Sequence, residues 1–248
     1  MPTASGGYYL KDGTRVPSVT TILGVWEKDA LKRWAAMQER EYISKAVNEF
    51  LDNGATRDEI RILLNQIKGQ QPAYDIVTKR AATIGTVVHQ MADDFLSGQV
   101  DTAAVIAEHE LTEDSAGKAL TAFDAFRRWA DGVKFEPVMR EQPLVSELYR
   151  FGGTPDLVSI NGRRSMGDFK TSSGVYHSYL QQVAAYGKAW DENHPEEPID
   201  GGYYAIRFDK ERGDFHHHSW PELDDAWEAF TIARRAYDLL KELKKRCK

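Results

Sequence analysis

The chain has 248 residues, which is enough for one substantial core with a helical accessory region, so we expect one or two domains. Hydrophobic residues make up 42% and charged residues 28%, which excludes a disordered or fibrous protein. The net charge of −6, from 32 Lys and Arg against 38 Asp and Glu, argues against a protein that coats nucleic acid through bulk charge.

Hydropathy and cysteine content limit the classes of membrane protein and of redox or metal site that the chain can form. No apolar run approaches the roughly 20 residues that span a bilayer, and Met1–Tyr9 lacks the features of a signal peptide. We therefore expect a cytoplasmic protein with no membrane partner. Cys247 is the only cysteine, which excludes internal disulfides, cysteine-ligated zinc and a four-cysteine iron–sulfur cluster. Any metal must be held by oxygen or histidine ligands.

The chain opens with a predicted hairpin. Tyr8–Leu10 and Arg15–Val16 flank a turn at Asp12-Gly13, and Pro17 ends the second segment.

Helical periodicity dominates the following hundred or so residues. Ser18 is a candidate N-cap for the first helix, and Thr56 with Glu59 fits a capping box. The predicted helices are Val19–Leu23, Lys28–Leu51, Arg57–Ile67, Ala73–Leu96 and Ser115–Ala130.

From Phe135 the hydrophobic period becomes that of strands. The predicted strands are Val138–Ser146, Phe151–Ile160, Ser165–Lys170, Tyr203–Phe208 and Phe215–Trp220. Two helices, Tyr176–Asn193 and Leu223–Lys245, complete the chain, with Pro221 expected in the first turn of the last. The pattern predicts an α/β (α+β) fold, with an N-terminal helical region at 1–132 packed on a mixed-sheet core at 133–248, together one compact unit.

The stretch with the clearest chemical content contains two carboxylates and an ammonium. Asp156 ends a Gly-Gly-Thr-Pro-Asp segment, and Asp168 and Lys170 stand two apart in a predicted strand. Residues two apart in a strand leave the same face of the sheet. We therefore expect Asp168 and Lys170 to share a site.

Hairpin parity decides whether Asp156 joins them. A two-residue loop at Asn161-Gly162 would put Asp156 and Asp168 on opposite faces. A three-residue loop Ile160–Gly162, with its glycine in the left-handed region, would instead pair Asp156 with Met166 and bring both carboxylates to one face. We predict such an odd loop or a nearby bulge.

Carboxylate oxygens of this kind suit Mg²⁺ or Mn²⁺, which activate water and stabilise a charged phosphate. Lys170 would supply a fixed positive charge close to the attacking water or the phosphate. The alternative is a surface Asp–Lys pair without function.

Five short motifs occur in a fixed order over about residues 15–190. They are Pro17–Leu23 with its Ser-Val-Thr, Gly85 with His89, Gly153 with Asp156, Asp168 with Lys170, and Gln182 with Tyr186. In this order the sequence resembles the RecB-like branch of the PD-(D/E)XK nucleases, a group that includes phage exonucleases and the mitochondrial genome maintenance exonuclease. The resemblance implies a restriction-endonuclease-like fold, a mixed central sheet flanked by helices.

The resemblance also implies roles for individual residues. Lys170, Asp168 and Asp156 would be catalytic. The metal ligands would be His89, Asp156, Asp168 and the backbone carbonyl of Phe169. Substrate-binding residues would be Gln182, Tyr186, Ser18, Thr20, Thr171 and Arg80. For His89, Tyr186 and Ser18, a satisfied helix histidine, a packed core side chain and a plain helix cap remain the alternatives.

The implied activity is a Mg²⁺- or Mn²⁺-dependent deoxyribonuclease, an exonuclease acting on DNA with single-stranded or free ends and leaving 5′-phosphates. Its expected setting is replication, recombination or repair, with phage recombination or replication proteins as candidate partners. The compact stand-alone architecture suggests the cytoplasm of a bacterial or phage-infected cell. The sequence has no P-loop, so ATP is not an expected cofactor. A structure-selective endonuclease and a catalytically silent DNA-binding protein are the alternatives.

Two further patterns invite functional assignments. His216, His217 and His218 are consecutive in a predicted strand, so their side chains alternate between faces and cannot all bind one ion. Trp26, Trp34 and Trp129 could stack on unpaired bases, but core packing is the preferred interpretation for each.

Overall fold

The computed structural model describes residues 7–26, 29–133, 135–160 and 162–247. Within these residues, no helix combines the length and the apolar character that crossing a membrane requires. The chain forms two compact units, one made of Met1–Trp26 with Ile84–Lys248 and the other of Glu27–Thr83. The division predicted from sequence, at residues 1–132 and 133–248, stays a prediction.

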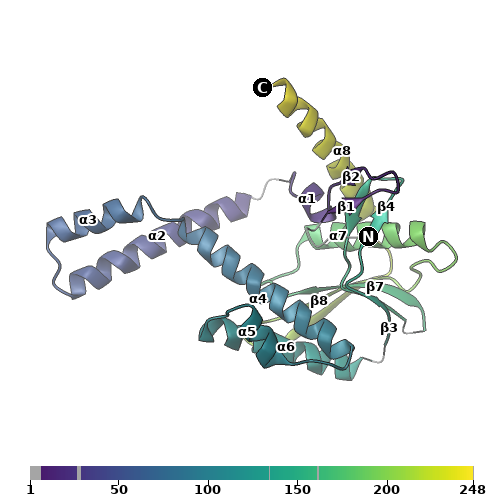
Figure 1. The fold of residues 1–248 in the computed structure, drawn as a ribbon, viewed down its shortest axis with the longest axis horizontal. Helices are drawn as coiled ribbons and strands as arrows, with labels where there is room; N and C mark the ends of the chain where they lie inside the picture. The colour runs from purple at the N-terminus through teal and green to yellow at the C-terminus, as the bar shows by residue number, and fades with distance from the viewer. Residues whose placement is uncertain (1–6, 27–28, 134, 161, 248) are drawn as a thin grey trace. The chain divides into compact units, whose positions relative to one another are not determined.

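A five-stranded mixed sheet lies at the centre of the larger unit (Figure 1). Its strands, in spatial order, are β3 (Glu136–Arg140), β6 (Leu157–Ile160), β7 (Arg164–Lys170), β8 (Tyr203–Phe208) and β9 (Phe215–Trp220). Only the β7–β8 pair is parallel, and the other three pairs are antiparallel. The predicted mixed sheet with flanking helices is confirmed.

Two of the predicted strands are each divided in two, so the prediction of continuous strands was wrong. Val138–Ser146 contains parts of β3 and β4 (Leu144–Ser146), and Phe151–Ile160 contains β5 (Phe151–Gly153) and β6. Strands β4 and β5 pair with each other in a separate sheet. Pro143 and Pro155 stand at the two breaks, where a residue without an N–H cannot continue a ladder.

The N-terminal hairpin is confirmed and lies along β5. Strands β1 (Tyr8–Tyr9) and β2 (Arg15–Val16) pair antiparallel around a turn in which Gly13 has a φ of +81°. The Gly152 amide donates to the Pro17 carbonyl at 3.0 Å. The hairpin is thereby attached to the segment that leads into Asp156.

One face of the sheet is covered by α1 (Val19–Leu23), α7 (His177–Asn193) and α8 (Asp224–Arg246). Val158 and Met166 of the sheet pack there against helix residues such as Tyr186. Helix α8 starts at Asp224. The prediction that Pro221 lies in its first turn was wrong, because Pro221 precedes the helix.

The opposite face is covered by α6 (Glu113–Gly132), by α5 (Thr102–Glu108), which the sequence did not predict, and by α4 (Ala73–Leu96) from Ile84 onward. Phe169 of β7 packs there edge-on against Phe126 and Trp129 of α6. The side chains of successive β7 residues therefore point to opposite faces of the sheet. Phe169 points to the α6 side, and Asp168 and Lys170 point to the α7 side.

The smaller unit contains α2 (Asp29–Asp52), α3 (Arg57–Ile67) and the first turns of α4. The capping box of α3 is confirmed, because Thr56 and Glu59 each accept from the other's backbone amide. Tyr42 Oη donates to Gln70 Oε1 at 2.9 Å within this unit.

Candidate active site

The β6–β7 hairpin brings the two carboxylates to one face of the sheet. Its register pairs Leu157 with Gly167, so Asp156 stands across from Asp168. Gly162, at a φ of +76°, lies in the three-residue connection that follows Ile160. The predicted odd loop is confirmed. Its predicted position was wrong by one residue, because β6 extends through Ile160 and the loop spans 161–163, of which residue 161 lies outside the described residues. Asp156 accordingly does not pair with Met166.

Three side chains converge into a group that suits a divalent cation. The ligand atoms of His89, Glu141 and Asp156 all lie within 4.8 Å of one another. His89 Nδ1 is 2.9 Å from Asp156 Oδ1 and 3.7 Å from Glu141 Oε1. One imidazole and two carboxylates form a donor set that hard or borderline divalent ions accept. The residues present therefore fit a metal ion of the Mg²⁺ or Mn²⁺ class.

Each member of this group comes from a different element. His89 lies on α4, Glu141 follows β3 and Asp156 precedes β6. Glu141 has a φ of +43°, an uncommon value for a non-glycine residue, and its amide donates to the Asp156 carbonyl at 3.3 Å. The Phe169 amide donates to the second carboxylate oxygen of Asp156. The Phe169 amide thus orients the Asp156 carboxylate, and the Glu141 amide holds the backbones of the two acidic residues together.

The electrostatics of the group favour a positive charge between the carboxylates. Burial opposes protonation of His89, but the adjacent Asp156 carboxylate outweighs it and raises the pKa of the imidazole to about 10. The same pairing lowers the pKa of Asp156 against the effect of burial. Burial raises the pKa of Glu141. A site that holds a proton this strongly also attracts a metal cation, which must displace that proton.

A second set of contacts lies on the α7 side of β7. The Lys170 ammonium pairs with the Asp168 carboxylate and donates to Gln182 Oε1 at 3.2 Å. The Gln182 amide nitrogen faces Asp168 Oδ1 at 3.3 Å and donates to the Tyr186 hydroxyl at 2.9 Å. Lys170 Nζ also lies 4.7 Å from the centre of the Tyr179 ring. Gln182 thus links Lys170, Asp168 and Tyr186 in one network.

Lys170 is held in its charged form. Burial alone would lower its pKa, but the Asp168 carboxylate reverses the effect and the pKa is raised above its ordinary value. Burial raises the pKa of Asp168 to about 6, against the effect of the Lys170 charge. At neutral pH the pair is an ammonium beside a carboxylate, able to donate hydrogen bonds toward a negative group.

The two glycines before Asp156 allow close packing on both sides of β5. A Cβ on Gly152 would lie 2.2 Å from Cγ of Tyr8, and one on Gly153 would lie 2.2 Å from Cε1 of Tyr186. Neither ring could keep its place against a larger residue. The Gly-Gly pair therefore positions Tyr8 of the hairpin and Tyr186 of the network around Gln182.

The structure brings together most of the residues that the sequence singled out. Those that lie in the two contact sets are His89, Asp156, Asp168, Lys170, Gln182 and Tyr186. Thr171 lies beside α4, the helix that carries His89, because a Cβ on Gly85 of that helix would be 3.3 Å from Thr171 Oγ1. Ser18 caps α1 as predicted, accepting from the Thr21 amide at 3.0 Å.

Other assignments stay predictions. Asp168 is not in the three-residue group, and its carboxylate instead contacts Lys170. The Phe169 carbonyl as a metal ligand likewise stays a prediction. Thr20 is exposed, and Arg80 is exposed on the smaller unit.

Sequence reasoning missed Glu141. It is one of 38 acidic residues, and no spacing relates it to the recognised motifs. Only the bend between β3 and β4 brings it beside His89.

Two residue types named as candidates have packing roles. His217 accepts from Trp129 Nε1 at 3.3 Å, while His216 and His218 stack with each other on the other side of β9. Trp129 is 3% exposed, which confirms the core interpretation. Trp26 is half-buried and donates to Gln181 Oε1 at 3.0 Å.

Comparison with known proteins identifies a family and similar solved structures. The sequence profile of the PD-(D/E)XK nuclease superfamily matches residues 61–246. No curated protein matches the chain. A crystal structure from Eubacterium rectale, titled a "putative exonuclease", is similar at 12% identity and a TM-score of 0.44, over 62% of this chain and 68% of that one. That likeness carries no argument about activity.

Proposed function

Because the chain belongs to the PD-(D/E)XK nuclease superfamily, we propose that it is a metal-dependent DNA exonuclease of the RecB-like branch. The observation that carries the proposal is the meeting of two contact sets across the β6–β7 hairpin. His89, Glu141 and Asp156 form a cation site, and Asp168 with Lys170 stands directly across from Asp156.

His89, Glu141 and Asp156 would hold the metal, with Asp168 as a further ligand from β7. When bound, Mg²⁺ or Mn²⁺ activates water and stabilises the charge of the phosphate. The protein orients Asp156 before the metal arrives, because the Phe169 amide already donates to its carboxylate. The Glu141 amide donates to the Asp156 carbonyl and keeps the two residues adjacent. This arrangement reduces the reorganisation needed at the moment of reaction.

Lys170 acts as a fixed cation and not as a base. Its raised pKa keeps it protonated at neutral pH, so it donates hydrogen bonds to the attacking water or to the phosphate oxygens. Gln182 accepts from Lys170 and fixes its ammonium, and Tyr186 in turn fixes Gln182. Gln182 and Tyr186 are thus positioning residues in this proposal.

The substrate is DNA with single-stranded or free ends, and the products carry 5′-phosphates. The ordered motifs shared with the RecB-like branch support this assignment, as they support a setting in replication, recombination or repair. The metal chemistry by itself does not distinguish DNA from other phosphodiesters.

The test uses single-stranded DNA labelled at the 5′ or the 3′ end, incubated with Mg²⁺, Mn²⁺ or EDTA and resolved on a gel. We expect metal-dependent shortening of linear DNA, and the label that is released first gives the polarity. Lys170→Ala should abolish cleavage, whereas Lys188→Ala, which removes a half-exposed lysine of α7, should retain it. Glu141→Gln should require more Mn²⁺ for half-maximal activity.

Two results would contradict the proposal. Cleavage of circular single strands at the rate of linear ones would identify an endonuclease. Intact DNA in every metal, with DNA binding retained, would identify a catalytically silent DNA-binding protein.

A further inference from the structure

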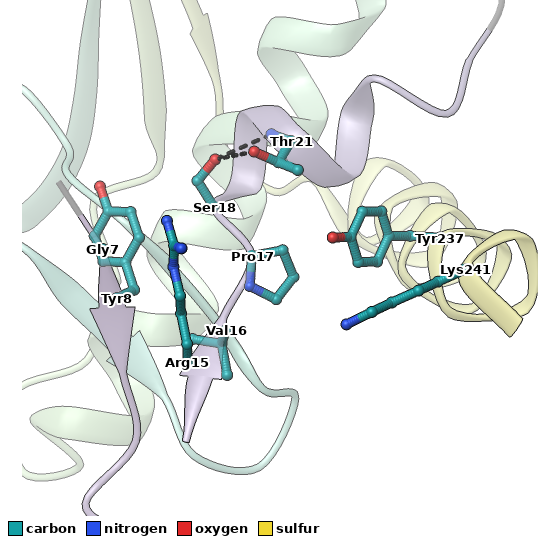
Figure 2. A pocket seen from close by; sticks show the side chains of 9 residues that line it. All are labelled: Gly7, Tyr8, Arg15, Val16, Pro17, Ser18, Thr21, Tyr237 and Lys241. Atoms are coloured by element: carbon teal, nitrogen blue, oxygen red, sulfur yellow. Dashed lines mark hydrogen bonds between the residues drawn. The ribbon is translucent and has the colours of Figure 1, made fainter. Parts of the chain in front are cut away.

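A cavity of about 350 Å³ lies between the N-terminal hairpin, the start of α1 and the C-terminal helix α8 (Figure 2). Its polar and charged lining comes from segments at the two ends of the sequence: Tyr8, Arg15, Ser18 and Thr21 from one end, Tyr237 and Lys241 from the other. The metal group lies outside this lining.

The cavity is positively charged in a chain whose net charge is −6. Arg15 and Lys241 reach into it from opposite walls (Figure 2), and none of the described residues that line it is acidic. Within the described part of the chain, neither cation has an ion-pair partner. Asp238, the residue after Tyr237, pairs with Arg234 instead.

Uncompensated cations beside hydroxyl groups have one common ligand chemistry. A phosphate offers several acceptor oxygens and a full negative charge, and arginine, lysine, serine, threonine and tyrosine are the side chains that usually contact it. We propose that this cavity binds a phosphate group of the nucleic-acid strand on which the metal centre acts. The inference rests on the proposed function and adds a second contact point for the substrate.

One wall of the cavity is linked to Asp156 of the metal group by a hydrogen bond and a short backbone segment. Tyr8 is hydrogen-bonded to Thr154 Oγ1 at 2.9 Å, and Thr154 stands two residues before Asp156. The Tyr8 ring lies against Gly152, whose amide donates to the Pro17 carbonyl. A phosphate held in the cavity therefore sets the position of the strand relative to Asp156.

The experiment measures DNA binding in EDTA, so that it does not depend on catalysis. The full-length chain is titrated into fluorescent single-stranded 20-mers with a 5′-phosphate or a 5′-hydroxyl, at several NaCl concentrations, and anisotropy gives Kd. The variant is Arg15→Ala with Lys241→Ala. The matched control is Arg235→Ala with Lys244→Ala, which removes the same charges from exposed positions of α8 outside the cavity lining.

We expect the cavity variant to raise Kd about 10-fold, as for loss of a charged hydrogen-bonded contact, and the control to change it far less. The slope of log K against log salt should become shallower by about 0.7 for one lost phosphate contact on a single strand. If the wild type prefers the 5′-phosphate DNA and the cavity variant loses that preference, the cavity binds the terminal phosphate. If the variant binds both DNAs equally more weakly than the wild type does, the cavity binds an internal phosphate.

Equal Kd changes in the cavity variant and the control would overturn the proposal, as would a wild-type chain that does not bind either DNA. Failure of the nuclease proposal is distinguishable. In that case cleavage is absent with every metal while the cavity variant still weakens DNA binding.

Discussion

Replacing Gly153 with alanine should disable the Lys170 side of the site without altering any charged group. The new Cβ would lie 2.2 Å from Cε1 and 2.9 Å from Cδ1 of Tyr186. Since carbon atoms in ordinary contact are about 3.5 Å apart, the ring must move by roughly 1.3 Å, the difference between 3.5 and 2.2. Tyr186 is only 4% exposed, so the ring has little free space to enter.

The displacement reaches Lys170 through one intermediate. Gln182 donates to the Tyr186 hydroxyl at 2.9 Å and accepts from Lys170 at 3.2 Å. A misplacement of about 1 Å in a positioned catalytic group costs on the order of 10²-fold in rate. We expect kcat for single-stranded DNA in saturating Mn²⁺ to fall by about that factor. Overpacking lowers the free energy of unfolding by about 1–3 kcal/mol. We therefore also expect a lower Tm for Gly153→Ala, by about 2–4 °C for each kcal/mol lost in a chain of this size.

Two further variants separate steric displacement from a general effect of alanine. Gly117→Ala, on α6, places its Cβ where nothing lies within 4 Å, so activity should be unchanged and stability slightly increased. Adding Tyr186→Leu to Gly153→Ala should recover much of the lost Tm but not the activity, because the hydroxyl that fixes Gln182 is gone. Wild-type kcat and Tm in Gly153→Ala would refute the reasoning.

Two other predictions concern stability and pH. Glu192 accepts from Ser146 Oγ at 2.5 Å and from two amides of the β4–β5 turn at 2.8 and 3.0 Å, so Glu192→Ala should lower the free energy of unfolding by about 2–3 kcal/mol. Urea titration measures it, and a change below about 0.5 kcal/mol, typical of a plain surface substitution, would contradict it. The pKa of His89 is raised to about 10 by Asp156, outweighing burial. Its protonated form therefore stabilises the fold fully below the unfolded pKa of about 6.5, and the effect is lost as pH rises through about 10. In EDTA, the Tm advantage of the wild type over His89→Gln should shrink from pH 6 to pH 10. Conversely, Mn²⁺ binding by calorimetry should weaken as pH falls, because the ion competes with that proton; an affinity independent of pH would exclude His89 as a ligand.

The sequence determined the parts of this protein that depend on neighbouring residues. Alternation within β7 placed Asp168 and Lys170 on one face. The requirement that Asp156 join them predicted a loop of odd length, although its position was wrong by one residue. Helix periodicity and capping residues located most helices, including the Ser18 cap of α1. These features follow from backbone geometry over a few residues, which is why they can be read without the fold.

Only the tertiary structure decided which distant residues meet. His89 and Asp156 are 67 positions apart and come into contact because α4 packs along the sheet. Glu141 joins them through a bend with an uncommon backbone conformation. The cavity between Arg15 and Lys241 joins segments near the two ends of the chain. Such contacts depend on packing over the whole chain, because no local pattern in the sequence records which surfaces are buried together.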